Sequence, residues 1–333
     1  MELNACLTRQ LNIELIHRWG GSVIESLLDP QCSFFKLPDV EGLIGYSANR
    51  KCAVVFGDPV CPPWNRERLV DAFHLFCEQQ KKNVVYLVAS QEFAEWWQQK
   101  QQGGCITFGE ELYLDPRRDP KLHSGKRGIV LRGKIRKAEK LGVSIKELCN
   151  ENIELEQKIQ DVATQWIQHR KGPQIYISRV RLFSERYGKR WFYAQQGDQI
   201  VGCLTIIQLQ AKKGWVLDRI MTVPNAPQGT PELLVMSLLE RLAEEECGFL
   251  TFGATNGAFL GSMTGFGKLT SFLAPRIYKA AIHYFKIEGK RKFWEKFFPE
   301  SAPSYILFKK ASLSFHEISG LMRALNVSYQ KST

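Results

Sequence analysis

Short β-like runs alternate with helix-like segments along this chain, and the same order of elements occurs twice. In the first series, the runs SFFKLP, GLIGYSAN and KCAVVFG precede a helix predicted over residues 66–80, and the apolar run NVVYLVAS follows it. In the second, a helix predicted over residues 150–170 precedes RWFYAQQ, QIVGCLTIIQL and GWVLDRIMTV, and the helix ELLVMSLLERLAEEE then leads to GFLTFG. This alternation predicts an α/β fold with mixed sheets whose helices cover the sheet faces.

The repeated order predicts two units. A chain of 333 residues exceeds what one hydrophobic core usually supports. We place the boundary near Cys149, which gives an N-terminal unit of residues 1–149 and a C-terminal unit of residues 150–333. No Gly/Ser-rich or Pro-rich linker separates them, so we expect the two units to pack closely. The dipeptide Gly197-Asp198 predicts a hairpin turn in the second unit.

Charge and cysteine usage bound the environment and the partners. Lys and Arg total 45 and Asp and Glu total 34, which gives a net charge of +11 and favours an anionic partner such as nucleic acid, an anionic membrane surface or a phosphate-bearing substrate. No apolar run approaches the roughly 20 residues that cross a bilayer, so we expect a soluble protein. The nine scattered cysteines contain no C-x-x-C pair, which favours a reducing, cytoplasmic compartment and no structural metal.

The segment DRIMTVPNAPQGTPELLV joins a predicted strand to a predicted helix. A Pro- and Gly-rich loop that opens onto a helix N-terminus binds anions through unpaired N–H groups, with Thr230 as the expected N-cap. An ordinary capped strand-to-helix turn is the alternative. The candidate substrate-binding residues here are Asn225, Gly229, Thr230 and Glu232. Neither G-x-G-x-x-G nor G-x-x-x-x-G-K-[ST] occurs, so we expect no nucleotide cofactor and no ATPase or dehydrogenase activity.

A second segment, KRGIVLRGKIRKAEKLG, predicts a basic helix. Its candidate polyanion-binding residues are Lys126, Arg132, Arg136 and Lys140. Three of them recur every four residues and so lie along one helix face, and the segment holds a single acid, Glu139. We therefore predict binding of a phosphate-bearing polyanion, against the alternative of a merely solvated face.

A third segment, FKIEGKRKFWEKFFPESAPSYI, interleaves basic and aromatic residues, including Lys296 and Phe297. This mixture is typical of nucleic-acid stacking and of membrane-interface docking, and equally of a helix that packs its aromatic side chains inward. Two further acids, Asp58 in FGDP and Asp218 in VLDR, lie at predicted strand ends, where catalytic carboxylates often lie. Structural carboxylates at loop boundaries are the commoner case.

Two of these segments carry a resemblance to a known family. DRIMTVPNAPQGTPELLV resembles a block of the phosphatidylglycerol lysyltransferase C-terminal domain, also called the multiple peptide resistance factor catalytic domain, and FKIEGKRKFWEKFFPESAPSYI resembles the closing block of the same family. The matching positions are Asp218, Pro224, Gly229 and Glu232 in the first block, and Lys296, Phe297, Pro299 and Tyr305 in the second. The chain departs from the family pattern at Met221, where members commonly carry Arg, and at Trp294, where they often carry Lys.

The resemblance implies two tandem GNAT-like subdomains that move an aminoacyl group from aminoacyl-tRNA to a lipid hydroxyl. On this reading Asp218 orients or deprotonates the nucleophile, and Arg219 or Lys296 supplies positive charge to the oxyanion or to a phosphate. Phe297 and Tyr305 join the substrate-binding residues, and the basic helix holds tRNA or anionic lipid headgroups.

Other functions remain open from the sequence. The expected location for a transferase of this kind is the cytoplasm, peripheral to the inner face of the membrane. An acyl-CoA-dependent GNAT N-acyltransferase and a non-catalytic module that keeps the fold are the alternatives. The sequence does not identify the amino acid, the acceptor or the oligomeric state.

Overall fold

The computed structural model describes residues 2–101, 103–169, 180–256, 260–285, 288–311 and 313–325. Its strands are β1 (Ser33–Phe35), β2 (Ile44–Ala48), β3 (Cys52–Phe56), β4 (Asn83–Ala89), β5 (Gly104–Leu114), β6 (Val143–Glu147), β7 (Lys189–Gln196), β8 (Gln199–Leu209), β9 (Gly214–Thr222), β10 (Leu250–Asn256), β11 (Met263–Thr264) and β12 (Glu300–Phe308). Its α-helices are α1 (Glu2–Trp19), α2 (Ile24–Leu28), α3 (Arg66–Gln79), α4 (Gln91–Lys100), α5 (Gly125–Lys140), α6 (Ile153–Gln168), α7 (Thr230–Glu244), α8 (Lys268–Phe285), α9 (Glu288–Trp294) and α10 (Phe315–Ala324). The short 3₁₀ helices are η1 (Pro63–Asn65), η2 (Pro120–Leu122), η3 (Gln210–Lys212) and η4 (Glu295–Phe297).

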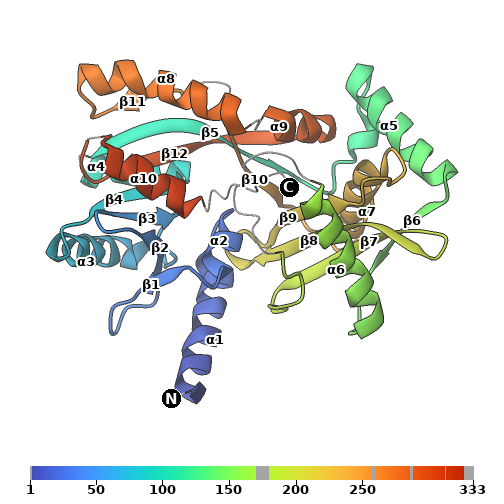
Figure 1. Cartoon of the computed structure of the whole chain (residues 1–333), viewed down its shortest axis with the longest axis horizontal. Helices are drawn as coiled ribbons and strands as arrows, with labels where there is room; N and C mark the ends of the chain where they lie inside the picture. Colours follow the sequence, from blue (N-terminus) through green and yellow to red (C-terminus); the bar gives the residue numbers. More distant parts are fainter. Residues whose placement is uncertain are drawn as a thin grey trace.

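One sheet of twelve strands runs through the described molecule, in the order β1-β2-β3-β4-β12-β5-β10-β9-β8-β7-β6, with β11 paired to β5 (Figure 1). At the centre of the sheet, strands from the N-terminal and C-terminal parts of the chain alternate. Strand β12, from the C-terminal part of the chain, lies between β4 and β5, whereas β5, from the N-terminal part, pairs with β10. The sheet is therefore continuous across the two predicted units. The division of the chain into two units after Cys149 stays a prediction.

The repeated order of elements read from the sequence is present in the structure. Strands β1 to β3 are antiparallel, and α3 then leads to β4, which pairs parallel to β3. Likewise β7 to β9 are antiparallel, and α7 leads to β10, which pairs parallel to β9. The hairpin predicted at Gly197-Asp198 joins β7 to β8, and Gly197 has φ +56°, a conformation that glycine adopts at little cost.

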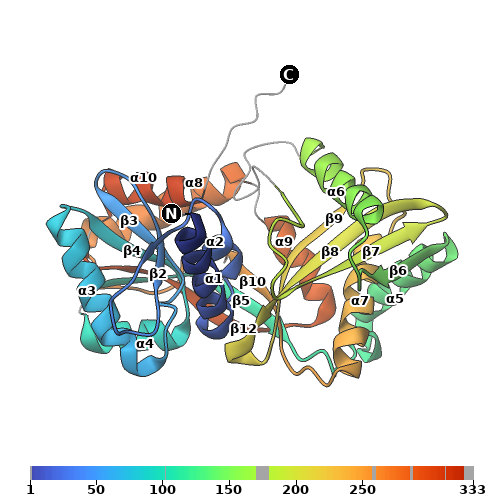
Figure 2. The same ribbon diagram turned by 90° about the horizontal axis from the view of Figure 1, so that it is seen from below.

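Helices cover both faces of the sheet (Figure 2). In the first part, Phe73 of α3 and Trp97 of α4 pack with Tyr86 of β4 in one core cluster. A second cluster joins α1, α2 and α10 to buried residues of β3 and β4. In the second part, α6 and α7 lie on opposite faces, and α5 packs on α7. The helix predicted over residues 150–170 is α6, with residue 170 outside the described part of the chain.

Candidate functional site

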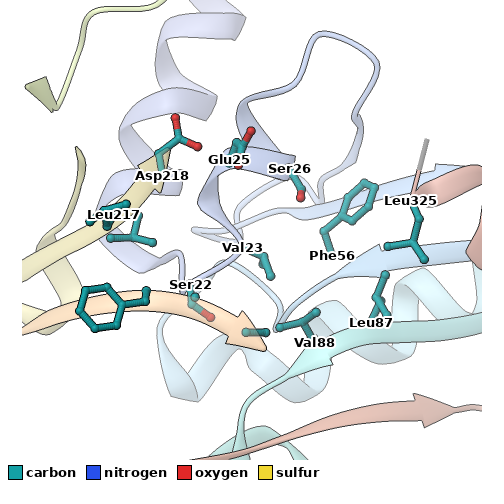
Figure 3. A pocket seen from close by; sticks show the side chains of 14 residues that line it. Ser22, Val23, Glu25, Ser26, Phe56, Leu87, Val88, Leu217, Asp218 and Leu325 are labelled. Carbon is teal, nitrogen blue, oxygen red and sulfur yellow. The ribbon is translucent and has the colours of Figure 1, made fainter. Parts of the chain in front are cut away.

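A pocket of about 160 Å³ lies where the two parts of the sheet meet, beside α2 (Figure 3). Its lining comes from the α2 region, from the ends of β3, β4 and α10, and from the middle of β9 and β10. The lining includes Ser22, Glu25, Phe56, Val88, Asp218 and Gly253. The pocket thus forms only after segments far apart in the sequence have come together.

The parting of two parallel strands gives the pocket one of its walls. Strands β9 and β10 pair at Trp215 with Leu250 and at Val216 with Thr251. The next residues of both strands, from Leu217 and from Phe252 onward, line the pocket. The parts of β9 and β10 that continued pairing of these two strands would cover are therefore available to a ligand.

Three irregularities in strand register coincide with the lining. The pairing of β9 with β8 shifts so that Asp218 is an extra residue between Leu217 and Arg219. The pairing of β10 with β5 shifts at Gly253, whose φ is +70°, and that of β4 with β12 shifts at Val88, whose φ is +63°. A left-handed conformation is strained for a β-branched residue such as Val88. Bulges re-aim side chains and are frequent beside active sites, so we regard this pocket as the candidate site.

The carboxylate of Asp218 accepts hydrogen bonds from side chains of β8 and β9. The Thr205 hydroxyl on β8 donates to Oδ2 at 3.1 Å, and Nε of Arg219 donates to Oδ1 at 3.4 Å. The Arg219 guanidinium also pairs with Glu25 of α2, and the Asp218 side chain is 8% exposed. Burial lowers the pKa of Arg219 to about 10, which leaves it protonated at neutral pH. An Asp–Arg–Glu chain therefore ties α2 to β9 and fixes the carboxylate in the pocket wall.

Sequence reasoning missed Glu25, Thr205 and Ser22, because no motif marks them and the helices before residue 33 were not predicted. Two further ionisable groups near the pocket were also missed. Burial raises the pKa of Glu111 on β5, which accepts hydrogen bonds from the Thr251 hydroxyl at 2.7 Å and from Ser22. Burial lowers the pKa of the Lys189 ammonium on β7, and this effect is opposed by the charge of Asp218.

The start of α7, predicted to bind anions, packs against α5 instead. The Thr230 N–H and hydroxyl both donate to the Pro227 carbonyl, at 3.1 and 2.7 Å. Gly229, at φ +101°, is the N-cap in place of the predicted Thr230, and a Cβ there would lie 2.0 Å from the Lys134 carbonyl oxygen of α5. Asn225 is exposed. None of these residues lines the pocket.

Glu232 and Lys296, predicted to act on substrate, pair with each other. Lys296 Nζ lies 2.6 Å from Glu232 Oε1, and 4.7 Å from the centre of the Phe293 ring. Phe297 is buried in the core, with Phe252 and Trp294 stacked beside it. Of these, only Phe252 lines the pocket. The interpretation of this segment as an inward-packing aromatic cluster therefore holds for Trp294 and Phe297.

Tyr305 lies in β12, in the first part of the sheet. It is half-buried and packs against the cluster of α3 and α4. Burial raises the pKa of its hydroxyl, with smaller contributions from Cys105 and Glu95. The structure brings Tyr305 to neither Asp218 nor the pocket lining.

The basic helix is α5, and its predicted polyanion-binding residues divide into two groups. Lys126, Arg136 and Lys140 are exposed to solvent. Arg132 is turned toward the protein, because its Nη1 donates to the carbonyls of Lys121 and His123 at 2.6 and 2.9 Å. No residue of α5 lines the pocket, and in both Figure 1 and Figure 2 this helix lies away from α2.

The described ranges contain neither a membrane-spanning helix nor a metal-binding cluster. None of the helices there is long and apolar enough to cross a membrane. In the same residues, no three His, Cys, Asp or Glu side chains come together in a way that would hold a metal ion.

Comparison with known proteins relates the chain to one family. A family model described as "Phosphatidylglycerol lysyltransferase, C-terminal" matches residues 26–308. A phosphatidylglycerol lysyltransferase of Staphylococcus aureus is 21% identical over 323 residues, which is 94% of this chain. The match covers 37% of that relative, so the chain spans little more than a third of the length of the curated proteins it resembles.

Solved structures share the fold. L-PGS from Bacillus licheniformis superposes with a TM-score of 0.76 at 18% identity, covering 95% of both chains. The C-terminal domain of a protein described as a lysylphosphatidylglycerol synthetase from Agrobacterium fabrum gives 0.77 at 15% identity, covering 96% of both. The predicted α/β fold with mixed strand pairing is confirmed.

Proposed function

Because the chain belongs to the family of phosphatidylglycerol lysyltransferase C-terminal domains, we propose that it transfers an aminoacyl group from a charged tRNA to a hydroxyl group of a lipid. The pocket between the two units is the site of transfer. The observation that supports this most is the position of Asp218. This bulge residue lines the pocket, and Thr205 and Arg219 orient its carboxylate.

Aminoacyl transfer needs only a few catalytic functions from the protein. An aminoacyl ester is already activated, so a catalyst has to place it, accept a proton and stabilise the oxyanion. The acceptor hydroxyl oxygen bonds to the ester carbonyl carbon, and the bond from that carbon to the tRNA ribose oxygen breaks. Asp218 accepts the proton of the attacking hydroxyl and returns it to the departing ribose oxygen. No oxidant, reductant or cofactor is needed.

Arg219 and Lys296 have different roles in this proposal. Arg219 is a positioning residue, because its guanidinium bonds to Asp218 and pairs with Glu25. Lys296 lies outside the pocket lining and neutralises the buried carboxylate of Glu232, so it supports the packing of α7. Positive charge for the oxyanion is therefore not assigned to Lys296.

The acyl-CoA alternative draws no support from the turn where α7 begins. A pyrophosphate cradle needs free N–H groups at a helix N-terminus. Here the Thr230 N–H is bonded to Pro227, Pro231 has no N–H, and Gly229 lies against the backbone of α5.

The test is an aminoacyl transfer assay on the whole chain. Total tRNA charged with a mixture of radiolabelled amino acids is incubated with the protein and phosphatidylglycerol vesicles, and lipid-bound label is measured. We expect labelled lipid with the wild type and none with Asp218→Asn. Absence of transfer with every amino acid, from a protein that melts cooperatively, would contradict the proposal and favour the non-catalytic module. The N-acyltransferase alternative is tested separately by a thermal-shift titration with several acyl-CoAs, because a bound ligand raises the melting temperature.

A further inference from the structure

Helix α5 has a buried side and an outer side of different character. Its buried residues are Gly128, Leu131, Ile135 and Ala138, which face α7 and η4. At 100° per residue, the opposite side of the helix carries the solvent-facing positions. We call these the outer face of α5, which comprises Lys126, Ile129, Arg136, Lys137 and Lys140, together with Leu122 of η2 just before the helix.

The outer face exposes two large aliphatic side chains. Leu122 is 83% exposed and Ile129 is 64% exposed. A single exposed aliphatic side chain is common on protein surfaces and indicates nothing by itself. Here Ile129 stands among cations on the solvent-facing side of α5, and Leu122 lies in η2 just before the same helix. A combination of exposed aliphatic and basic residues is typical of helices that lie in a membrane interface.

The charge of the outer face is of one sign. Lys126, Arg136 and Lys140 are exposed, and Glu139 is the one acid in α5. Lys137 donates to the Gln228 side chain at 2.6 Å, a neutral partner that leaves its charge uncompensated. The cations of the outer face therefore complement an anionic surface.

The apolar residues separate two kinds of anionic partner. A nucleic-acid backbone would engage the cations and leave Leu122 and Ile129 in water. A bilayer interface accepts the cations at its headgroups and removes both aliphatic side chains from water. We propose that the outer face of α5 binds an anionic membrane surface. The proposal deepens the transferase function by naming the surface that brings the enzyme to its lipid, and vesicle binding is measured without any tRNA, so either can fail alone.

The first experiment is co-sedimentation of the whole chain with vesicles. One set contains phosphatidylcholine only, and the other contains equal parts phosphatidylcholine and phosphatidylglycerol. We expect binding to the anionic vesicles and little to the neutral ones. A charge variant, Lys126→Gln/Arg136→Gln/Lys140→Gln, should lose about 100-fold in affinity, because each cation near an anionic surface contributes about fivefold. An apolar variant, Leu122→Asn/Ile129→Asn, should lose about 10-fold or more.

Matched controls keep the kind of substitution and move it elsewhere. Ile153→Asn changes an aliphatic residue on α6 that is 87% exposed. Lys51→Gln/Arg68→Gln/Lys81→Gln removes three exposed cations of the first unit. Both controls should bind anionic vesicles as the wild type does. Because every substituted side chain in the four variants is exposed, melting temperatures should stay near that of the wild type.

A parallel titration with uncharged tRNA separates the membrane from RNA. The apolar variant should bind tRNA as the wild type does while losing vesicle affinity. The proposal is overturned if the apolar variant keeps full vesicle affinity. It is also overturned if the charge variant keeps vesicle affinity and loses only tRNA.

Discussion

Among the described strands, each half of the sheet contains one parallel pair, and the two pairs end differently. Strands β3 and β4 stay paired from Cys52 with Asn83 to Phe56 with Leu87. Strands β9 and β10 pair only at Trp215 with Leu250 and at Val216 with Thr251, and then separate around the pocket. An acid follows or interrupts the first strand of each pair, Asp58 in the first half and Asp218 in the second.

The two acids have different partners. Asp58 accepts hydrogen bonds from the Ser90 N–H at 2.9 Å and from the Ser90 hydroxyl at 2.6 Å, and so fixes the residue that caps α4. Asp218 is bonded to side chains of β8 and β9 and lines the pocket. The comparison indicates that the acid of the first half holds a helix cap, whereas the acid of the second half lies in the lining of the pocket.

The largest expected effect is on turnover. Asp218→Asn keeps the size of the side chain and removes the proton acceptor, so we expect transfer to fall by about 10²- to 10⁴-fold. The melting temperature should change little. The measurement is the lipid transfer assay alongside a thermal melt, with Asp58→Asn as the matched variant in the other half. Equal loss of transfer in both variants would break the comparison.

The second prediction concerns how the free energy of unfolding depends on pH through His74, a buried residue of the first half. Burial lowers the pKa of His74 to about 4, below its ordinary value of 6.5. Between these values the unfolded chain binds the proton and the folded chain does not, so the free energy of unfolding falls as pH drops from 6.5 toward 4, by up to about 3 kcal/mol. His74→Gln should remove that part of the pH dependence in urea titrations. His169→Gln, at the exposed C-cap of α6, should leave it unchanged, and a slope unaltered by His74→Gln would count against the buried neutral state.

Removing the structural acid should cost stability rather than turnover. Asp58→Ala leaves the Ser90 N–H and hydroxyl without their acceptor, and we expect a loss of about 2 kcal/mol in the free energy of unfolding. The transfer rate per folded molecule should match the wild type. A stable variant that has lost transfer would instead give Asp58 a functional role.

The smallest effect concerns the orientation of Asp218. Thr205→Val keeps the shape and removes the hydroxyl that donates to the carboxylate, so we expect transfer to fall by about 10-fold. Thr205→Ser restores the donor and should recover most of the rate. If the serine variant is as slow as the valine variant, packing rather than the hydrogen bond is responsible.

Local patterns predicted local structure well. The helix predicted over residues 66–80 is α3, and the predicted basic helix is α5. Both could be predicted because apolar periodicity and helix-end signals depend on residues that are neighbours in the sequence. Strand β12 was not predicted. Its Pro303 argues against a central strand, yet it lies where β12 pairs only with β5 and β4 partners begin at Tyr305.

The candidate site was predicted only in part. Asp218, which matches the family block, lines the pocket, and Arg219 donates a hydrogen bond to it; their catalytic roles stay predictions. Lys296 and Glu232 match the family pattern equally well but pair with each other away from the pocket. Glu25 reaches the site through the packing of α2 on a distant strand, and a contact of that kind leaves no periodic signal in the sequence.

The most direct test of the account is a crystal structure with an aminoacyl-adenosine analogue whose ester is replaced by an amide. The account predicts density in the pocket beside α2, with the acyl carbon within reach of the Asp218 carboxylate. Density at the turn where α7 meets α5, with the pocket empty, would contradict it.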